Sequence, residues 1–458
     1  MVSGKGTVKP SLQFLGVSAY DVAGSVNLLR FKKYCTLLDA GWAQGFDIMT
    51  AYKINKEAVK KVKVKEIDYI VLSHLNNDHH GLCPALFARG CNAHIYITQG
   101  SLPFLKLLWE DSLKIHLQDC QKLQNKHGIK ASPLYEQSDI ERALNRVVEI
   151  PYDTPYQINS GMTLTFYPAG HIIHSAQVLI EMREGSVIKR VGYGGDIGAK
   201  PQPYVEPRKS LPFVDCYVGE TTYCVPARPD KIRDRQKDLE KIQSAINQFR
   251  KILIPCFSLQ RTQTILRMLW GKVETGNIPI YLDSPLASKI CAMWDDSPMW
   301  RDIMSNVKVI NSSEESKKLQ ESNEHCIIIS ASGFLAGGRI MSHLKTALDK
   351  SSTCILFVGY AGGNNLASQI KSGQKEVNVD GTIVKNRANI IELRSFSSHA
   401  SYEELLEYYQ SLRYDKIALH HGEFESKVTF ANALQQKLID QGKSARVIAT
   451  NMDTKIYV

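Results

Sequence analysis

The sequence predicts an α/β protein in which one domain is inserted into another. Its 458 residues exceed what a single ordinary core accommodates, so two domains are expected. Short apolar strands alternate with helical segments between residues 252 and 358, as in a parallel sheet with crossover helices. Closely spaced strands predominate in residues 11–38 and 148–195, and again after residue 385. The alternating segment therefore interrupts a β-rich domain.

Individual elements follow from turn residues and apolar spacing. Glycines and a Lys-Lys pair separate three strands near the N-terminus, at residues 12–17, 26–31 and 34–38. Residues 102–145 carry apolar side chains at helical spacing and are predicted to be mostly helical. A charged run at residues 228–241 continues into a helix that ends near Phe249. The strands of the alternating segment are expected at residues 252–254, 279–283, 327–330 and 354–358.

Composition is typical of a soluble globular protein, with 43% apolar and 22% charged residues. The sequence predicts neither a signal peptide nor a membrane span. Ten cysteines are scattered without a Cys-x-x-Cys pair, which favours reduced thiols and a cytoplasmic location. The net charge of +10 suits a polyanionic partner, but many unrelated proteins are equally basic.

Residues 73–81, with the sequence SHLNNDHHG, are dense in metal-binding side chains. The apolar run at residues 70–72 predicts a buried strand that leads into them. His74, Asp78 and His79 then share one short loop, and imidazole and carboxylate are the ligands that Zn²⁺ takes when it holds and activates water. One loop cannot complete such a site, so further ligands are expected downstream.

Further histidines and acidic residues follow apolar runs downstream, in short segments rich in glycine or acidic residues. They are His171, His174, Asp196, Glu220, His399, His420 and His421. Each residue alone is weak evidence for a functional site, because a histidine at a strand end is more often structural. An aspartate such as Asp39 in Asp39-Ala40-Gly41 usually stabilises a turn. The ordered set is improbable by chance, and polar residues at strand ends are how an α/β scaffold presents a site.

The ordered set resembles the β-CASP branch of the metallo-β-lactamase superfamily. That branch contains the pre-mRNA 3′-end cleavage endonuclease, its bacterial and archaeal relatives, and RNase J. The residues that match its successive motifs are Asp39, His74–Gly81, Gly170-His171, Gly195-Asp196, Glu220, His399 and His421. Segments similar to signatures of its inserted domain are residues 254–261, 283–285, 332–339 and 358–360.

The resemblance implies a fold and a domain order. The fold would be a four-layer αβ/βα metallo-β-lactamase sandwich with an inserted Rossmann-like β-CASP domain. The first domain would occupy residues 1–223 and 386–458, and the inserted domain residues 224–385.

The resemblance also implies two zinc ions. Their ligands would be Asp78, His79 and His421 for one, His74 and His171 for the other, and Asp196 as a bridge. Glu220 would orient His399, and His399 would donate a proton to the leaving oxygen as a general acid. Asp39 would buttress the ligand loops. The predicted catalytic residues are thus Asp78, Glu220 and His399.

The activity that the resemblance implies is zinc-dependent hydrolysis of phosphodiester bonds in single-stranded RNA, most similar to that of the compact endoribonucleases. His421 favours RNA, because DNA-acting members of the family carry Val at that position. A second copy of the chain or a related β-CASP chain is the protein partner expected. Two rivals stay open: a metal-poor scaffold or RNA-binding protein, and a hydrolase of another phosphodiester.

Several positions depart from the family pattern. Asn76 stands where the second motif has a ligand histidine, which weakens the first metal site, and His174 stands where the third motif ends in glycine. We hypothesise that His174, three residues after His171, replaces the lost imidazole; the alternative is that it only packs nearby. His80 and His420 are expected to point away from the site. Other departures are residues 224–228 and 362–365.

Overall fold

The computed structural model describes residues 9–200, 202–227, 233–273, 275–276, 278–333, 335–359 and 365–458. Its contacts divide the chain into two compact units, one running through Pro226 and resuming at Ser398, the other spanning Ala227–Ser397. Four positions or segments within the motifs named above lie outside the described residues: Arg228, Phe334, Tyr360 and residues 362–364. No helix in the described part of the chain is long and apolar enough to cross a membrane.

The first unit contains two seven-stranded sheets. The first sheet has the order β22-β1-β2-β3-β4-β5-β6. Its strands are β1 (Ser11–Phe14), β2 (Val26–Phe31), β3 (Tyr34–Ala40), β4 (Tyr69–Val71), β5 (His94–Thr98), β6 (Val147–Ile150) and β22 (Lys455–Tyr457). Strands β3 to β6 run parallel to one another, whereas β22, β1, β2 and β3 pair antiparallel.

The second sheet has the order β21-β20-β11-β10-β9-β8-β7. Its strands are β7 (Tyr156–Asn159), β8 (Met162–Pro168), β9 (Ala176–Glu184), β10 (Val187–Tyr193), β11 (Val214–Glu220), β20 (Tyr414–His420) and β21 (Arg446–Ala449). Strands β10, β11, β20 and β21 are parallel. Strand β11 thus pairs with a strand that lies beyond the whole second unit in the sequence.

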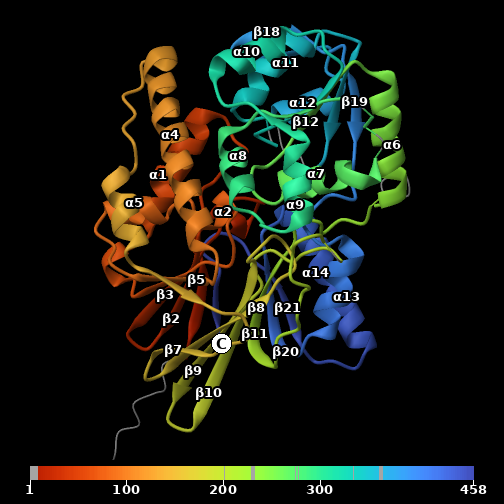
Figure 1. Cartoon of the computed structure of the whole chain (residues 1–458). Coiled ribbons are helices and arrows are strands. Elements are labelled where there is room, and N and C mark those ends of the chain that lie inside the picture. The colour runs from red at the N-terminus through yellow and green to blue at the C-terminus, as the bar shows by residue number, and fades with distance from the viewer. Residues whose placement is uncertain are drawn as a thin grey trace, which may run out of the picture. The chain divides into compact units, whose positions relative to one another are not determined.

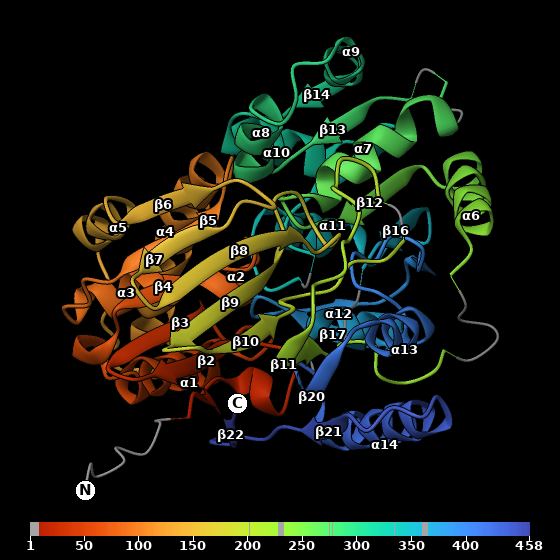
Figure 2. The ribbon, with the colours of Figure 1, turned by 90° about the horizontal axis from the view of Figure 1, so that it is seen from below.

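Helices cover the outer faces of the two sheets, which makes four layers (Figures 1 and 2). On the first sheet these are α1 (Ile48–Lys61), α3 (Cys83–Ala88), α4 (Leu102–His127) and α5 (Gln137–Leu144). The short helix α2 (Asn77–His80) follows β4, and two 3-10 turns, η1 (Val17–Ala19) and η2 (Val64–Glu66), lie elsewhere in the same unit. On the second sheet they are α13 (Tyr402–Ser411) and α14 (Phe424–Asp440). The core between the sheets includes Leu12, Phe14, Val178 and Ile180, all fully buried.

The second unit is a six-stranded parallel sheet with the order β14-β13-β15-β12-β16-β19. Its strands are β12 (Lys251–Pro255), β13 (Ile280–Leu282), β14 (Val307–Val309), β15 (Cys326–Ser330), β16 (Thr353–Phe357) and β19 (Asn389–Glu392). A hairpin of β17 (Glu376–Val379) and β18 (Thr382–Lys385) precedes the last strand. Its helices are α6 (Arg235–Gln248), α7 (Arg261–Lys272), α8 (Pro285–Ala292), α9 (Pro298–Ser305), α10 (Ser313–Glu321), α11 (Arg339–Ala347) and α12 (Leu366–Lys371).

The predicted fold class is confirmed: a four-layer α/β sandwich carries an inserted parallel α/β unit. The units divide after Ser397, whereas the sequence placed the return at residue 386. The difference arises because β19 adds to the parallel sheet of the second unit, where Ile390 pairs with Ile355. All ten cysteines are free and buried.

A buried histidine on α4 makes the first unit sensitive to acid. His116 is 5% exposed, and its Nε2 accepts a hydrogen bond from the Leu134 amide at 2.9 Å. Burial lowers the pKa of His116 from 6.5 to about 4. Below pH 6.5 the unfolded chain therefore binds a proton that the folded chain does not, so stability falls as the pH drops and levels off near pH 4.

We expect His116→Gln, which keeps an acceptor at the position of Nε2, to reduce this acid sensitivity. The lost stability is at most about 3 kcal/mol. Thermal unfolding midpoints measured from pH 7 to pH 4.5 should fall further for the unaltered chain than for the variant. Equal slopes for both chains would contradict the assignment.

Candidate metal centre and general acid

The candidate site lies in the first unit, where loops leave the carboxyl ends of strands from both sheets. The segment after β4, which includes the short helix α2, carries residues 73–81, the loop after β8 carries His171, and the loop after β10 carries Asp196. Glu220 is the last residue of β11, and it pairs in register with His420, the last residue of β20. Parallel pairing of β11 with β20 therefore places His421 beside the end of β11.

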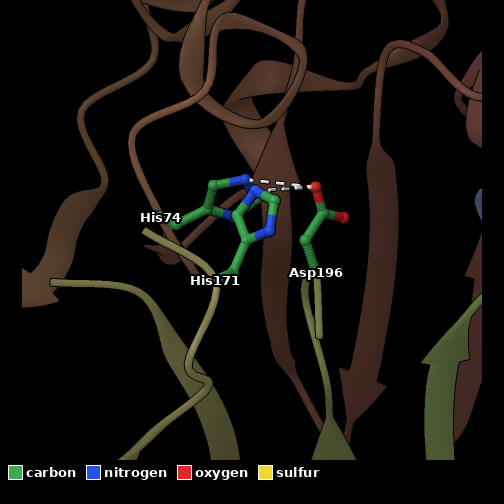
Figure 3. A group of neighbouring side chains, drawn as sticks. All are labelled: His74, His171 and Asp196. Carbon is green, nitrogen blue, oxygen red and sulfur yellow. Dashed lines mark ion pairs between the residues drawn. The ribbon is translucent and has the colours of Figure 1, made fainter. Parts of the chain in front are cut away.

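One group of side chains joins His74, His171 and Asp196 (Figure 3). His74 Nε2 lies 3.4 Å from Asp196 Oδ2, and His171 Nε2 lies 3.5 Å from the same oxygen. All three residues are buried. Both rings thus turn a nitrogen toward one carboxylate oxygen.

A second group joins Asp78, His79 and His421. His421 Nε2 lies 3.4 Å from Asp78 Oδ2, and His79 Nε2 lies 3.3 Å from Asp196 Oδ1. Asp196 therefore faces the first group with one oxygen and the second group with the other. The structure brings together all six residues that the sequence predicted as ligands of two ions.

Asp39 holds the segment after β4 in place through hydrogen bonds to Ser73 and His79. Its carboxylate accepts hydrogen bonds from the Ser73 amide and the Ser73 hydroxyl, both at 2.7 Å. It also accepts hydrogen bonds from His79 Nδ1 and from the Tyr193 hydroxyl, both at 2.6 Å. Asp39, Ser73 and Tyr193 are all buried. Asp39 is thus a fully bonded carboxylate, as expected of a residue that orients ligands.

These hydrogen bonds also select the ring tautomers. His79 donates from Nδ1 to Asp39, so its Nε2 is the nitrogen that faces Asp196 Oδ1. The Ser73 hydroxyl donates to Asp39, so its oxygen accepts from His74 Nδ1 at 3.0 Å. His421 Nδ1 pairs with the Thr222 hydroxyl at 3.0 Å. Each of these three rings can therefore present Nε2 to a cation.

Burial and charge act in opposite directions on the central groups. Burial raises the pKa of Asp196, but the neighbouring His79, His421 and His74 outweigh it and hold that pKa well below its usual value. Asp196 is therefore ionised at neutral pH. Burial lowers the pKa of His171 well below its usual value, so this ring is a neutral imidazole.

Atoms without hydrogen-bond partners show that the residues fit a bound cation. Among the described residues, six buried atoms of the predicted ligands have no such partner: His74 Nε2, His79 Nε2, His171 Nδ1, Asp78 Oδ1, and Asp196 Oδ1 and Oδ2. Buried polar groups are normally satisfied, and a cluster of free imidazole and carboxylate lone pairs is the donor set of zinc.

A carboxylate-histidine pair stands beside the two groups. His399 Nδ1 lies 3.1 Å from Glu220 Oε1, and His399 Nε2 lies 3.8 Å from Asp196 Oδ2. Glu220 is fully buried, and it also accepts hydrogen bonds from the Ile197 and Thr222 amides at 3.1 and 2.8 Å. The His399 side chain is 17% exposed, so it is the member of the pair that solvent reaches.

The residues that depart from the family pattern are placed as follows. The Asn76 amide lies 3.4 Å from His171 Nε2. The His174 ring lies against Gly100, whose position would bring a Cβ within 2.7 Å of it, and 5.9 Å from the Phe104 ring. The structure does not bring His174 into either group.

His80 and His420 both point away from the two groups. His80 Nδ1 accepts a hydrogen bond from the Trp109 indole at 3.0 Å. The His420 ring packs against Phe14 and Tyr193. Sequence reasoning missed Ser73, Thr222 and Tyr193; their proximity to the motifs was the available signal, but only the fold shows which side chains turn inward.

A four-layer sandwich whose loops gather histidines around a shared aspartate defines a metallo-hydrolase of the metallo-β-lactamase type. Three family models match the chain, and they are consistent with this class. They are the metallo-beta-lactamase superfamily domain over residues 28–194, the Beta-Casp domain over 260–370, and the Zn-dependent metallo-hydrolase RNA specificity domain over 383–443. The chain belongs to the β-CASP family of the metallo-β-lactamase superfamily.

Relatives with similar sequences carry ribonuclease and termination-factor names. The chain is 28% identical to "Ribonuclease TTHA0252" of Thermus thermophilus over 91% of this chain and 94% of the relative. It is 27% identical to the "RNase J-like protein" of Methanocaldococcus jannaschii over 83% and 87%. It is 25% identical to "Transcription termination factor FttA" of the same organism, covering 81% of this chain and only 61% of FttA.

A solved structure shares the fold. A protein of unknown function from Enterococcus faecalis V583 superposes with a TM-score of 0.54 at 11% identity, over 98% of this chain and 100% of that one. This likeness concerns the fold alone.

Tyr193 should matter for metal binding although it touches no ligand atom. We expect Tyr193→Phe to lower metal affinity about tenfold, because Asp39 loses one of its four hydrogen bonds and holds His79 less firmly. Tyr217→Phe is the matched control: Tyr217 is equally buried, but its hydroxyl donates to Gln177. Competition with a chromophoric chelator measures the affinity, and equal losses in both variants would contradict the role.

Proposed function

We propose that the protein is a zinc-dependent ribonuclease that hydrolyses phosphodiester bonds of single-stranded RNA. The observation that carries the proposal is Asp196, whose two oxygens face the two histidine groups while His399 stands 3.8 Å from one of them. The names of the relatives and the matched RNA specificity domain support RNA as the substrate. Cytoplasmic location and a second copy or related β-CASP chain as partner belong to the same proposal.

The two groups of ligands would hold two zinc ions. His74 and His171 would hold one, Asp78, His79 and His421 the other, and Asp196 both. When bound, such a pair of ions supplies an activated water and neutralises charge on the scissile phosphate. The chain's own contribution is the fixed orientation of the ligands through Asp39, Ser73 and Thr222.

His399 is the proposed general acid. Burial lowers the pKa of its ring, but the charges of Glu220 and Asp196 outweigh it and raise that pKa above its usual value. The protonated ring donates from Nδ1 to Glu220, and its other N–H at Nε2 points toward the side of Asp196. That second proton is available to the leaving oxygen as the bond to phosphorus breaks.

RNA is favoured over DNA by His421, the position at which DNA-acting members of the family carry Val. The net charge of +10 is favourable for any polyanion and does not separate the two substrates. The competing scaffold function rests on Asn76, which stands where the family pattern has a ligand histidine. Against it stand the six predicted ligands, which remain together, and the intact pair of His399 and Glu220.

Cleavage of labelled single-stranded RNA tests the function. We expect the protein supplied with zinc or manganese to cleave RNA, and a chelator or Asp78→Ala to lower the rate at least 100-fold, because the second group loses a ligand. Single-stranded DNA, duplex RNA and a dinucleotide serve as parallel substrates. Equal cleavage by the variant, or cleavage of DNA alone, would contradict the proposal.

The role of His399 predicts a specific rescue. We expect His399→Ala to slow RNA cleavage by a factor of 10² to 10⁴. The loss should largely disappear on RNA whose leaving oxygen is replaced by sulfur, because a thiolate leaves without a proton. Substrates with sulfur at either bridging position cover both directions of attack, and His94→Ala, a change at an exposed histidine on β5, is the control. A defect of equal size on oxygen and sulfur substrates would remove His399 from this role.

A further inference from the structure

The Asn76 side chain occupies an unusual position for an asparagine at the start of a helix. Asn76 is the residue that precedes α2, where an asparagine side chain commonly accepts a hydrogen bond from the helix's first amides. Here it makes no such bond. Instead its terminal amide lies 3.4 Å from His171 Nε2.

The two distances from His171 Nε2, one to Asp196 Oδ2 and one to the Asn76 amide, match the separation of two ligands on one ion. Two ligands of a tetrahedral zinc ion, each ~2.1 Å from the metal, stand ~3.4 Å apart. His74 Nε2 and His171 Nε2 lie 3.4 and 3.5 Å from Asp196 Oδ2, and the Asn76 amide lies 3.4 Å from His171 Nε2 (Figure 3 shows the first three side chains). In the structure Nδ2 faces the ring, and a half-turn of the amide puts Oδ1 in nearly the same place.

His174, the other candidate for the missing ligand, is committed elsewhere. Its backbone has φ +60, a left-handed conformation that favours glycine, and its carbonyl accepts a hydrogen bond from the Thr98 hydroxyl at 2.6 Å. The ring lies on Gly100, the residue that leaves room for it. This backbone conformation turns the ring toward Gly100 and Phe104 rather than toward Asp196.

We propose that Asn76 Oδ1 is the fourth protein ligand of the metal site formed by His74, His171 and Asp196. The inference rests on the proposed metal-dependent function and deepens it. A neutral amide oxygen is a harder and weaker donor to zinc than imidazole, whereas oxygen ligands suit Mn²⁺. The two sites are therefore unequal. The site of Asp78, His79 and His421 holds zinc more tightly, and the Asn76 site holds zinc less tightly and discriminates less strongly against manganese.

Metal titration of the full chain tests this asymmetry without any RNA. Zinc and manganese are titrated by calorimetry against the metal-free protein. We expect two zinc equivalents of clearly different affinity. Asn76→Ala should lower the zinc affinity of the weaker site at least tenfold. Asn76→His should raise the zinc affinity of that site at least tenfold and raise its manganese affinity much less. The tight equivalent should stay unchanged in both variants.

Cobalt gives a second readout. Co²⁺ bound at the weaker site should absorb visible light differently in the Asn76→His variant than in the unaltered chain, because the variant replaces an oxygen ligand with nitrogen. His174→Gly is the matched control, since glycine suits the backbone at that position, and it should leave the affinity of both equivalents unaltered. The Asn76 variants should fold normally because the side chain caps no helix amide, and circular dichroism checks this.

The outcomes separate the two proposals. An unchanged looser equivalent in Asn76→Ala, or its loss in His174→Gly, overturns the assignment of Asn76, whatever the RNA assay gives. Unequal metal sites that depend on Asn76 in a protein that cleaves no RNA would support the ligand and overturn the ribonuclease.

Discussion

The site depends on a single buried carboxylate, that of Asp39, which is not one of the six predicted metal ligands. Asp39 receives four hydrogen bonds, two from Ser73, one from His79 and one from Tyr193. Through Ser73 it reaches His74, so one side chain orients a ring in each of the two histidine groups. A buried carboxylate without its donors would be costly, so the four donors and the acceptor hold one another in place. These bonds restrain the segment that follows β4.

Around this anchor the strand order supplies the remaining groups. Strands β10, β11 and β20 run parallel, so their carboxyl ends deliver Asp196, Glu220 and His421 to the same edge. Strand pairing sets the spacing of these ends, and the core between the two sheets packs the two sheets against each other. Asp196 faces both histidine groups, whereas His399 lies beside them and is partly exposed to solvent.

Much of this could be predicted from the sequence because glycine-flanked polar residues at strand ends are a local signal. The insertion and most strands followed from apolar periodicity, and the six ligands came from motif order. The sequence could not show that β19 joins the inserted sheet, since an apolar strand at residues 389–392 reads the same in either sheet. Nor could it show where the His174 ring turns, because that depends on its left-handed backbone and on the space above Gly100. Tyr193 escaped notice because it looks like an ordinary strand residue.

The pairing of β11 with β20 has a consequence for the order in which the protein matures. These neighbours in one sheet are separated along the chain by the entire second unit. During synthesis β11 leaves the ribosome with an unpaired edge, and it keeps that edge until residues 414–420 emerge. His399 and His421 arrive in the same late stretch. A nascent chain therefore lacks both the proposed proton donor and one proposed metal ligand until the residues that follow the second unit have been synthesised, so the site can assemble only after the strand that closes the sheet has emerged.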